Sequence, residues 1–263
     1  MPKRMTDGGA AAPRRPRKKR RRARRRGLKI FLLVLIPLIA LTAACVFAVN
    51  YFFVIDTMTA AGSEHYTEAQ ILEASGLQMG DNLFKLLPWR ADELITKKLP
   101  YLESVSMKLK IPSGVHFEAV DAQACLIAQT DSGYYLVSDR YKVLDKLETP
   151  EGRALPLVRA NFGEEIAVGE KLPFLTQQDE KILIDIINYL YDNNKIDRVQ
   201  WVDLQRHIDI RLMVDNRFEV ELGDYMDLAQ KLQFAQGILA ELGEYDRGII
   251  DVSDTEKAIF EPS

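Results

Sequence analysis

The longest uninterrupted hydrophobic segment lies near the amino terminus, where residues 30–53 form a run of 24 uncharged residues. As a helix this run would extend roughly 36 Å, enough to cross a hydrocarbon core of about 30 Å with some tilt. Pro37 is compatible with a membrane helix, and Tyr51, Phe52 and Phe53 stand where interfacial aromatic side chains are common. The pattern therefore predicts a transmembrane helix over residues 30–53.

After this run the chain shows short, well-punctuated elements. A β-prone stretch covers 54–59, and Thr67 with Gln70 forms the capping-box pattern that opens a short helix. A second helix is expected near 91–99, followed by two alternating strands, 105–110 and 115–120, around a turn at 112–114. The predicted order over residues 54–121 is β-α-α-β-β.

The remaining segment, 122–263, is richer in strands. Amphipathic spacing predicts a helix after Thr176 and another over 228–242, the second ended by Gly243. Hydrophobic runs and strict alternation predict strands at 134–137, 143–147, 155–158, 199–204, 208–214, 218–222 and 248–252. We expect a mostly antiparallel β domain with helices, and α+β as the fold class of the whole.

Charge is distributed unevenly around the hydrophobic run. Residues 1–27 carry a net charge of +12, whereas the chain from residue 53 onward carries −16. The positive-inside rule then places the amino terminus in the cytoplasm and the carboxyl terminus outside. We expect the basic tail to contact anionic lipids, and no dedicated nucleic-acid role because the tail has no aromatic residue for base stacking.

A cleaved signal peptide or a lipoprotein processed at Cys45 is an alternative interpretation of the same run. Both require the hydrophobic segment to end soon after the cleavage site. The run continues past Cys45 to Phe53, which favours an uncleaved anchor.

The sequence offers no convincing catalytic, cofactor or metal site. It has no Gly-x-Ser-x-Gly or phosphate-loop pattern, and its three histidines and two cysteines lack metal-ligand spacing. Asp131, Ser132 and Gly133 are typical of a turn between strands, and the adjacent acids Glu164 and Glu165 are typical of a charged loop. We therefore expect a protein without catalytic activity, cofactor or metal.

Several segments together resemble the FtsQ/DivIB family of bacterial cell-division proteins. They are FFVIDTMTAAG at 52–62, TEAQILEASGLQMGDNLF at 67–84, LPYLESVSMKLKIPSGVHFEAVD at 99–121, GYYLVSDRYKVLDK at 133–146 and IIDVS at 249–253. The resemblance implies a cytoplasmic tail (1–29), a membrane helix (30–53), a POTRA domain (54–121) and a β domain (122–263). Residues 121–125 and Ser138-Asp139-Arg140 depart from the family's usual patterns.

The same resemblance implies a function and a site. It indicates a non-enzymatic divisome scaffold at the septum of the cell membrane. Its expected partners are bitopic proteins of the FtsB/DivIC and FtsL types, together with the septal peptidoglycan synthase whose activity it would help to control. Carried onto this chain, the family's partner contact falls on Lys257, Ala258, Ile259 and Phe260. Phe260→Lys is then expected to abolish partner binding while leaving the fold intact.

Two other functions remain open. One is a membrane-anchored cell-wall enzyme, which turnover of purified peptidoglycan would reveal. The other is a POTRA-type transport or chaperone module, since such domains also handle extended chains by strand pairing.

Overall fold

The computed structural model describes residues 18–263, with side chains from Phe31 onward. Its first element is a long helix, α1 (Lys18–Phe52), whose hydrophobic part Phe31–Phe52 has 22 residues and a mean hydropathy of 2.8. This helix is long and apolar enough to cross a membrane, which agrees with the sequence prediction and fits a single-pass membrane protein. Residues 1–17 of the predicted basic tail lie outside the described part, and so does the expected lipid contact of the tail's side chains. The chain divides after Val54 into α1 and a folded part that begins at Ile55.

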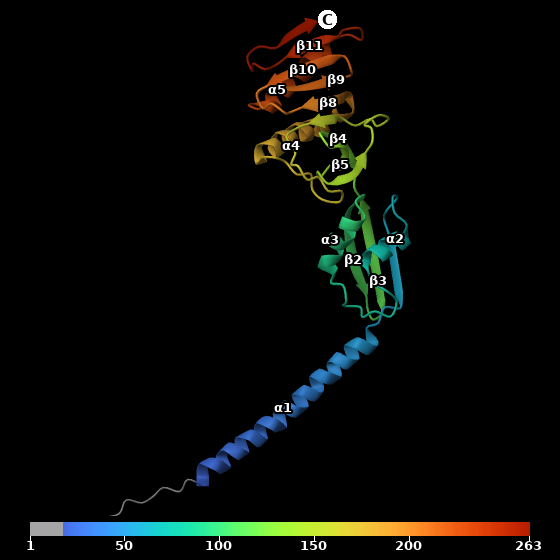
Figure 1. Cartoon of the computed structure of the whole chain (residues 1–263), viewed down its shortest axis with the longest axis vertical. Helices are drawn as coiled ribbons and strands as arrows, with labels where there is room; N and C mark the ends of the chain where they lie inside the picture. Colours follow the sequence, from blue (N-terminus) through green and yellow to red (C-terminus); the bar gives the residue numbers. More distant parts are fainter. Residues whose placement is uncertain (1–17) are drawn as a thin grey trace, which may run out of the picture. The chain divides into compact units, whose positions relative to one another are not determined.

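The first half of the folded part is a three-stranded sheet with two helices (Figure 1). Along the chain it contains β1 (Thr57–Ala61), α2 (Glu68–Ser75), α3 (Pro88–Lys98), β2 (Leu102–Lys110) and β3 (Gly114–Asp121). The strand order is β1-β3-β2, with β1 parallel to β3 and β2 antiparallel to it. The β-α-α-β-β prediction and the Thr67–Gln70 capping box are confirmed.

Three starting points in this region differ from the prediction, since α3 begins at Pro88 and β2 at Leu102, each three residues early, and β1 begins late. β1 begins at Thr57 rather than at Val54. The backbone of Ile55 and Asp56 is instead bonded to two loops, because the Ile55 and Asp56 amides donate to the carbonyls of Asp81 and Ser113, both at 2.8 Å. These residues join α1 to the sheet rather than lengthen β1.

The second half is a nine-stranded sheet with two long helices, α4 (Gln177–Asp192) and α5 (Leu228–Glu241), and a 3-10 turn, η1 (Ile196–Arg198). Its strands are β4 (Ala124–Thr130), β5 (Gly133–Ser138), β6 (Val143–Leu147), β7 (Leu157–Arg159), β8 (Val199–Asp203), β9 (Ile210–Val214), β10 (Phe218–Gly223), β11 (Gly248–Asp251) and β12 (Ile259–Pro262). The order across the sheet is β12-β11-β10-β9-β8-β7-β4-β5-β6.

The α+β class is confirmed, but the sheet is mixed rather than purely antiparallel. The pairs β4–β7, β7–β8 and β10–β11 are parallel, and the other neighbouring pairs are antiparallel. None of these three pairs is a hairpin: two strands lie between β4 and β7 in the sequence, α4 lies between β7 and β8, and α5 lies between β10 and β11. Local alternation cannot reveal such pairings because they are set by distant segments.

The main hydrophobic core lies between the sheet and the two helices. Inward-facing strand residues such as Leu212, Val220 and Ile250 pack with Ile186 of α4 and Leu232 of α5, all of them buried. A smaller core on the other face contains Ile127, Leu136 and Leu144. Alternate strand residues point to opposite faces, so the same strands place charged side chains on the face away from α4 and α5.

Side chains and backbone join the two halves of the folded part. Lys142, just before β6, donates from Nζ to the carbonyl of Thr96 in α3 at 2.9 Å and to that of Leu102 in β2 at 2.7 Å. The Tyr101 hydroxyl donates to Asp145 at 3.1 Å. These contacts tie the end of α3 and the start of β2 to β6.

Candidate partner interface

The carboxyl-terminal strand β12 forms one edge of the nine-stranded sheet. It pairs antiparallel with β11, with Ile250 opposite Phe260 and Asp251 opposite Ile259. In the described part of the chain no strand pairs with the other side of β12. Its outward backbone groups are therefore a template on which an extended segment of another chain can add.

The four residues predicted as the partner contact lie in different environments. Ile259 and Phe260 belong to β12, whereas Lys257 and Ala258 precede it and are exposed. Phe260 faces the main core, where its ring packs against Phe218 with centroids 6.1 Å apart. Ile259, opposite Asp251, faces the other side. The structure thus places two of the four on the edge strand and only one of those two away from the core.

A glycine controls how closely β12 approaches β11. Gly248, the first residue of β11, has φ +154°, and a Cβ atom there would lie 2.0 Å from the carbonyl oxygen of Glu261 in β12. Real Cβ atoms do not approach that closely, so only glycine permits this pairing without a shift of the strand. β12 is held at a position where a single methyl group would displace it.

Arg217, which directly precedes β10, supports the same edge. Its guanidinium donates from NH1 to the carbonyls of Gly243 and Glu244, at 3.0 and 2.7 Å, and lies 4.7 Å from the centre of the Phe218 ring. The Arg217 carbonyl also accepts the Gly248 amide at 3.2 Å. The loop that leads into β11 is thereby fixed to the start of β10.

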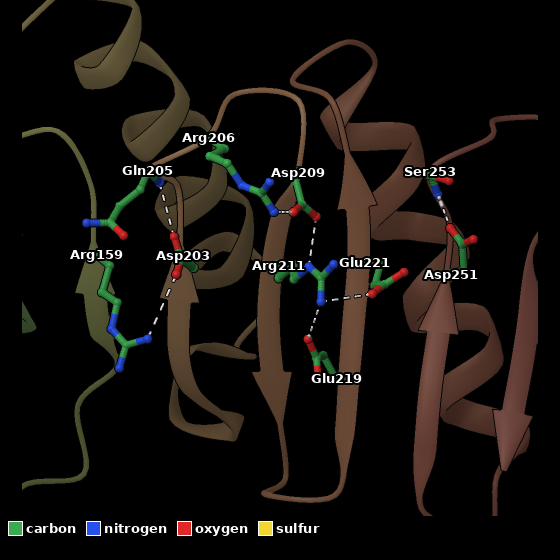
Figure 2. Close-up of polar contacts among 10 residues, drawn as sticks. All are labelled: Arg159, Asp203, Gln205, Arg206, Asp209, Arg211, Glu219, Glu221, Asp251 and Ser253. Atoms are coloured by element: carbon green, nitrogen blue, oxygen red, sulfur yellow. Dashed lines mark hydrogen bonds and ion pairs between the residues drawn. The ribbon is translucent and has the colours of Figure 1, made fainter. Parts of the chain in front are cut away.

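A row of charged side chains crosses the sheet face away from α4 and α5 and ends beside β12 (Figure 2). We call this the charged row; its members are Arg159, Asp203, Arg211, Glu219, Glu221 and Asp251. Arg211 NH1 lies 3.0 Å from Glu219 and 3.1 Å from Glu221, and its Nε donates to Asp209 at 2.8 Å. Arg159 and Asp203 form a looser pair at 3.9 Å.

The charged row was not identified from the sequence. The alternation of Glu219 and Glu221 with buried Phe218, Val220 and Leu222 does signal polar residues on one face of β10. It does not show that Arg211 lies opposite Glu221, because that depends on the β9–β10 register. The row provides fixed charges beside the edge.

The residues considered as catalytic candidates lie in a turn between two strands and in an exposed loop. Asp131 and Ser132 form the turn between β4 and β5, and Gly133 begins β5; the Ser132 hydroxyl lies 3.0 Å from that of Tyr135. Glu164 and Glu165 are exposed in a loop. Among the residues that the structure describes, no three His, Cys, Asp or Glu side chains gather as a metal site.

Comparison with known proteins decides the family. Residues 53–118 match the model for the FtsQ-type POTRA domain, and residues 126–254 match the model for the carboxyl-terminal region of the cell division proteins FtsQ and DivIB. The chain belongs to the FtsQ/DivIB family. The resemblance seen in the sequence is therefore confirmed, and the POTRA match covers the three-stranded sheet with α2 and α3 except for the last three residues of β3.

Two relatives extend this FtsQ/DivIB assignment over most of the chain. The cell division protein DivIB of Listeria monocytogenes is 20% identical over 202 residues, which cover 75% of this chain and 69% of the relative. DivIB of Clostridium acetobutylicum is 24% identical over 203 residues, covering 77% and 80%. Both are named as cell division proteins, which agrees with the predicted process.

Proposed function

We propose that the protein is a non-enzymatic scaffold of the division septum, which binds bitopic proteins of the FtsB/DivIC and FtsL types and so helps to control septal peptidoglycan synthesis. The observation that carries the proposal is the outer edge of β12. A partner strand added there would gain backbone hydrogen bonds, and Ile259 and the charged row would supply side-chain contacts. Membership of the FtsQ/DivIB family supports the cellular process.

The proposed domains are a cytoplasmic tail (1–29), a membrane helix (30–53), a POTRA domain (54–121) and a β domain (122–263). In this arrangement α1 holds the folded part at the outer surface of the membrane. The partners are membrane-anchored as well, so tethering both chains to one membrane raises their effective concentration. A short edge strand can then serve as a binding site without a large interface.

We expect a fluorescent fusion of the full chain to gather at midcell in dividing cells, and its depletion to produce filaments. Placing the fluorescent protein at the amino terminus leaves β12 free. A uniform membrane signal together with normal division would contradict the septal role. Turnover of purified peptidoglycan by the protein would instead favour the cell-wall enzyme.

The proposed orientation can be tested with a thiol introduced at an exposed site. Cys125 is unsuitable because it is buried and burial raises its pKa to about 12. Tyr245→Cys, at a position that is 91% exposed, in a Cys45→Ala background should react with a membrane-impermeant maleimide on intact cells. Cys45→Ala alone is the matched control and should stay unlabelled. Labelling of the introduced thiol only after lysis would reverse the proposed topology.

A further inference from the structure

Two exposed apolar side chains lie on loops of the three-stranded half. Met79 is in the loop between α2 and α3 and is 60% exposed, and Ile111 is in the turn between β2 and β3 and is 67% exposed. Exposure of large apolar side chains to water is unfavourable. A group of them at one end of a domain is typical of an interaction surface.

Backbone hydrogen bonds place both loops beside the first residues of the folded part. The Gly80 amide donates to the Ile55 carbonyl at 2.9 Å, and the Asp56 amide donates to the Ser113 carbonyl at 2.8 Å. Only two residues separate Ile55 from Phe52, the last residue of α1. Three residue steps span at most about 11 Å, so the chain itself keeps both loops near the membrane surface, whatever the orientation of the folded part.

A tryptophan is also exposed in this half. Trp89, in the first turn of α3, is 73% exposed. The carbonyl of Thr96, near the other end of α3, is bonded to Lys142 of the β domain. α3 therefore ends next to the β domain, and Trp89 lies at the opposite end of the helix. Arg90 and Lys85 are exposed next to it.

We propose that Met79, Trp89 and Ile111, here called the anchor-end patch, dock the POTRA domain onto the lipid bilayer that α1 spans. Tryptophan favours the boundary between headgroups and acyl chains, and cationic side chains beside it can contact lipid phosphates. Docking would restrict the tilt of the folded part and so the position of β12. The inference rests on α1 as a membrane anchor and does not depend on the partner edge.

The two tryptophans make the test direct, because the chain contains only Trp89 and Trp201. The full-length Trp201→Phe variant is reconstituted into phosphatidylcholine–phosphatidylglycerol vesicles, with or without bromine on the acyl chains near the headgroup. We expect brominated lipid to remove most of the Trp89 emission. The matched variant Trp89→Phe, which keeps Trp201 in β8, should keep its emission.

A second comparison tests the patch itself. Met79→Glu combined with Ile111→Glu, in the Trp201→Phe background, should abolish most of the quenching. Leu175→Glu combined with Ile208→Glu, two exposed apolar residues of the β domain, should leave it unchanged. Trp89 emission that ignores brominated lipid would overturn the proposal. A change in Trp89 emission that appears only when a partner protein is added, and not with lipid alone, would also overturn it. Either result leaves the partner-edge proposal standing.

Discussion

Replacing Gly248 by alanine should weaken partner capture at least about tenfold, the equivalent of about 1.4 kcal/mol. The added methyl group would meet the Glu261 carbonyl, whose oxygen lies 2.0 Å from the position of a Cβ atom. β12 must then move away from β11, while the parallel pairing of β11 with β10 remains possible. The measurement is the dissociation constant for purified extracytoplasmic parts of the proposed partners of the FtsB/DivIC and FtsL types.

Gly237→Ala is the matched control for this experiment. Gly237 lies in α5, and a Cβ atom there meets nothing within 4 Å. Removing a glycine from a helix interior should stabilise the protein by about 0.5–1 kcal/mol without affecting partner capture. Hydrogen exchange should show faster exchange in β12 of Gly248→Ala and little change in β10. Loosened β12 with unchanged affinity would exclude this strand as the binding edge.

Phe260→Lys is a less selective test than the sequence suggests. The Phe260 ring packs on Phe218 and on the main core, so lysine would remove this packing as well as alter the edge. Sequence pattern identifies Ala258, Ile259 and Phe260 as an apolar run but cannot show which side chain faces inward. That information comes from the register in which Phe260 stands opposite buried Ile250.

Local patterns predicted most individual elements correctly. The apolar spacing after Thr176 matches α4, and the alternation on either side of Asp215 and Asn216 matches β9 and β10. Both turn residues have positive φ, which is typical of a tight hairpin between antiparallel strands. Elements whose partners are close in sequence carry their own signals, and these are the ones that the sequence reveals.

The order of the strands in the nine-stranded sheet is the part that could not be predicted. β4 lies between β5, its hairpin partner, and β7, which follows it by nearly thirty residues. β11 joins β10 only after α5 has crossed the core. Such contacts are determined by packing of whole segments. The proposed partner edge depends on this order, because β12 becomes an edge only through its place next to β11.

Asp179 is a second feature that spacing alone did not identify. It is the third residue of α4, and its side chain is 1% exposed. Its carboxylate accepts hydrogen bonds from the Thr176 amide at 3.0 Å and from Asn161 Nδ2 at 2.8 Å, and lies 2.7 Å from His207 Nε2. It thus joins the start of α4 to the loop before α4 and to the loop between β8 and β9.

Asp179→Asn should therefore lower the free energy of unfolding by about 2–4 kcal/mol at neutral pH, because it removes a charged acceptor from several buried donors. Burial alone would raise the pKa of Asp179, but hydrogen bonds from Thr176, Asn161 and His207 outweigh it and lower that pKa below its usual range. A lowered pKa means that the stabilisation is present above the unfolded value of about 3.9 and is lost as the pH falls through the folded value. The difference between wild type and variant, measured by denaturant unfolding, should thus shrink below about pH 4. Asp185→Asn, at an exposed position of the same helix, should change the stability little at any pH, and a constant difference for Asp179→Asn across this range would contradict the assigned role.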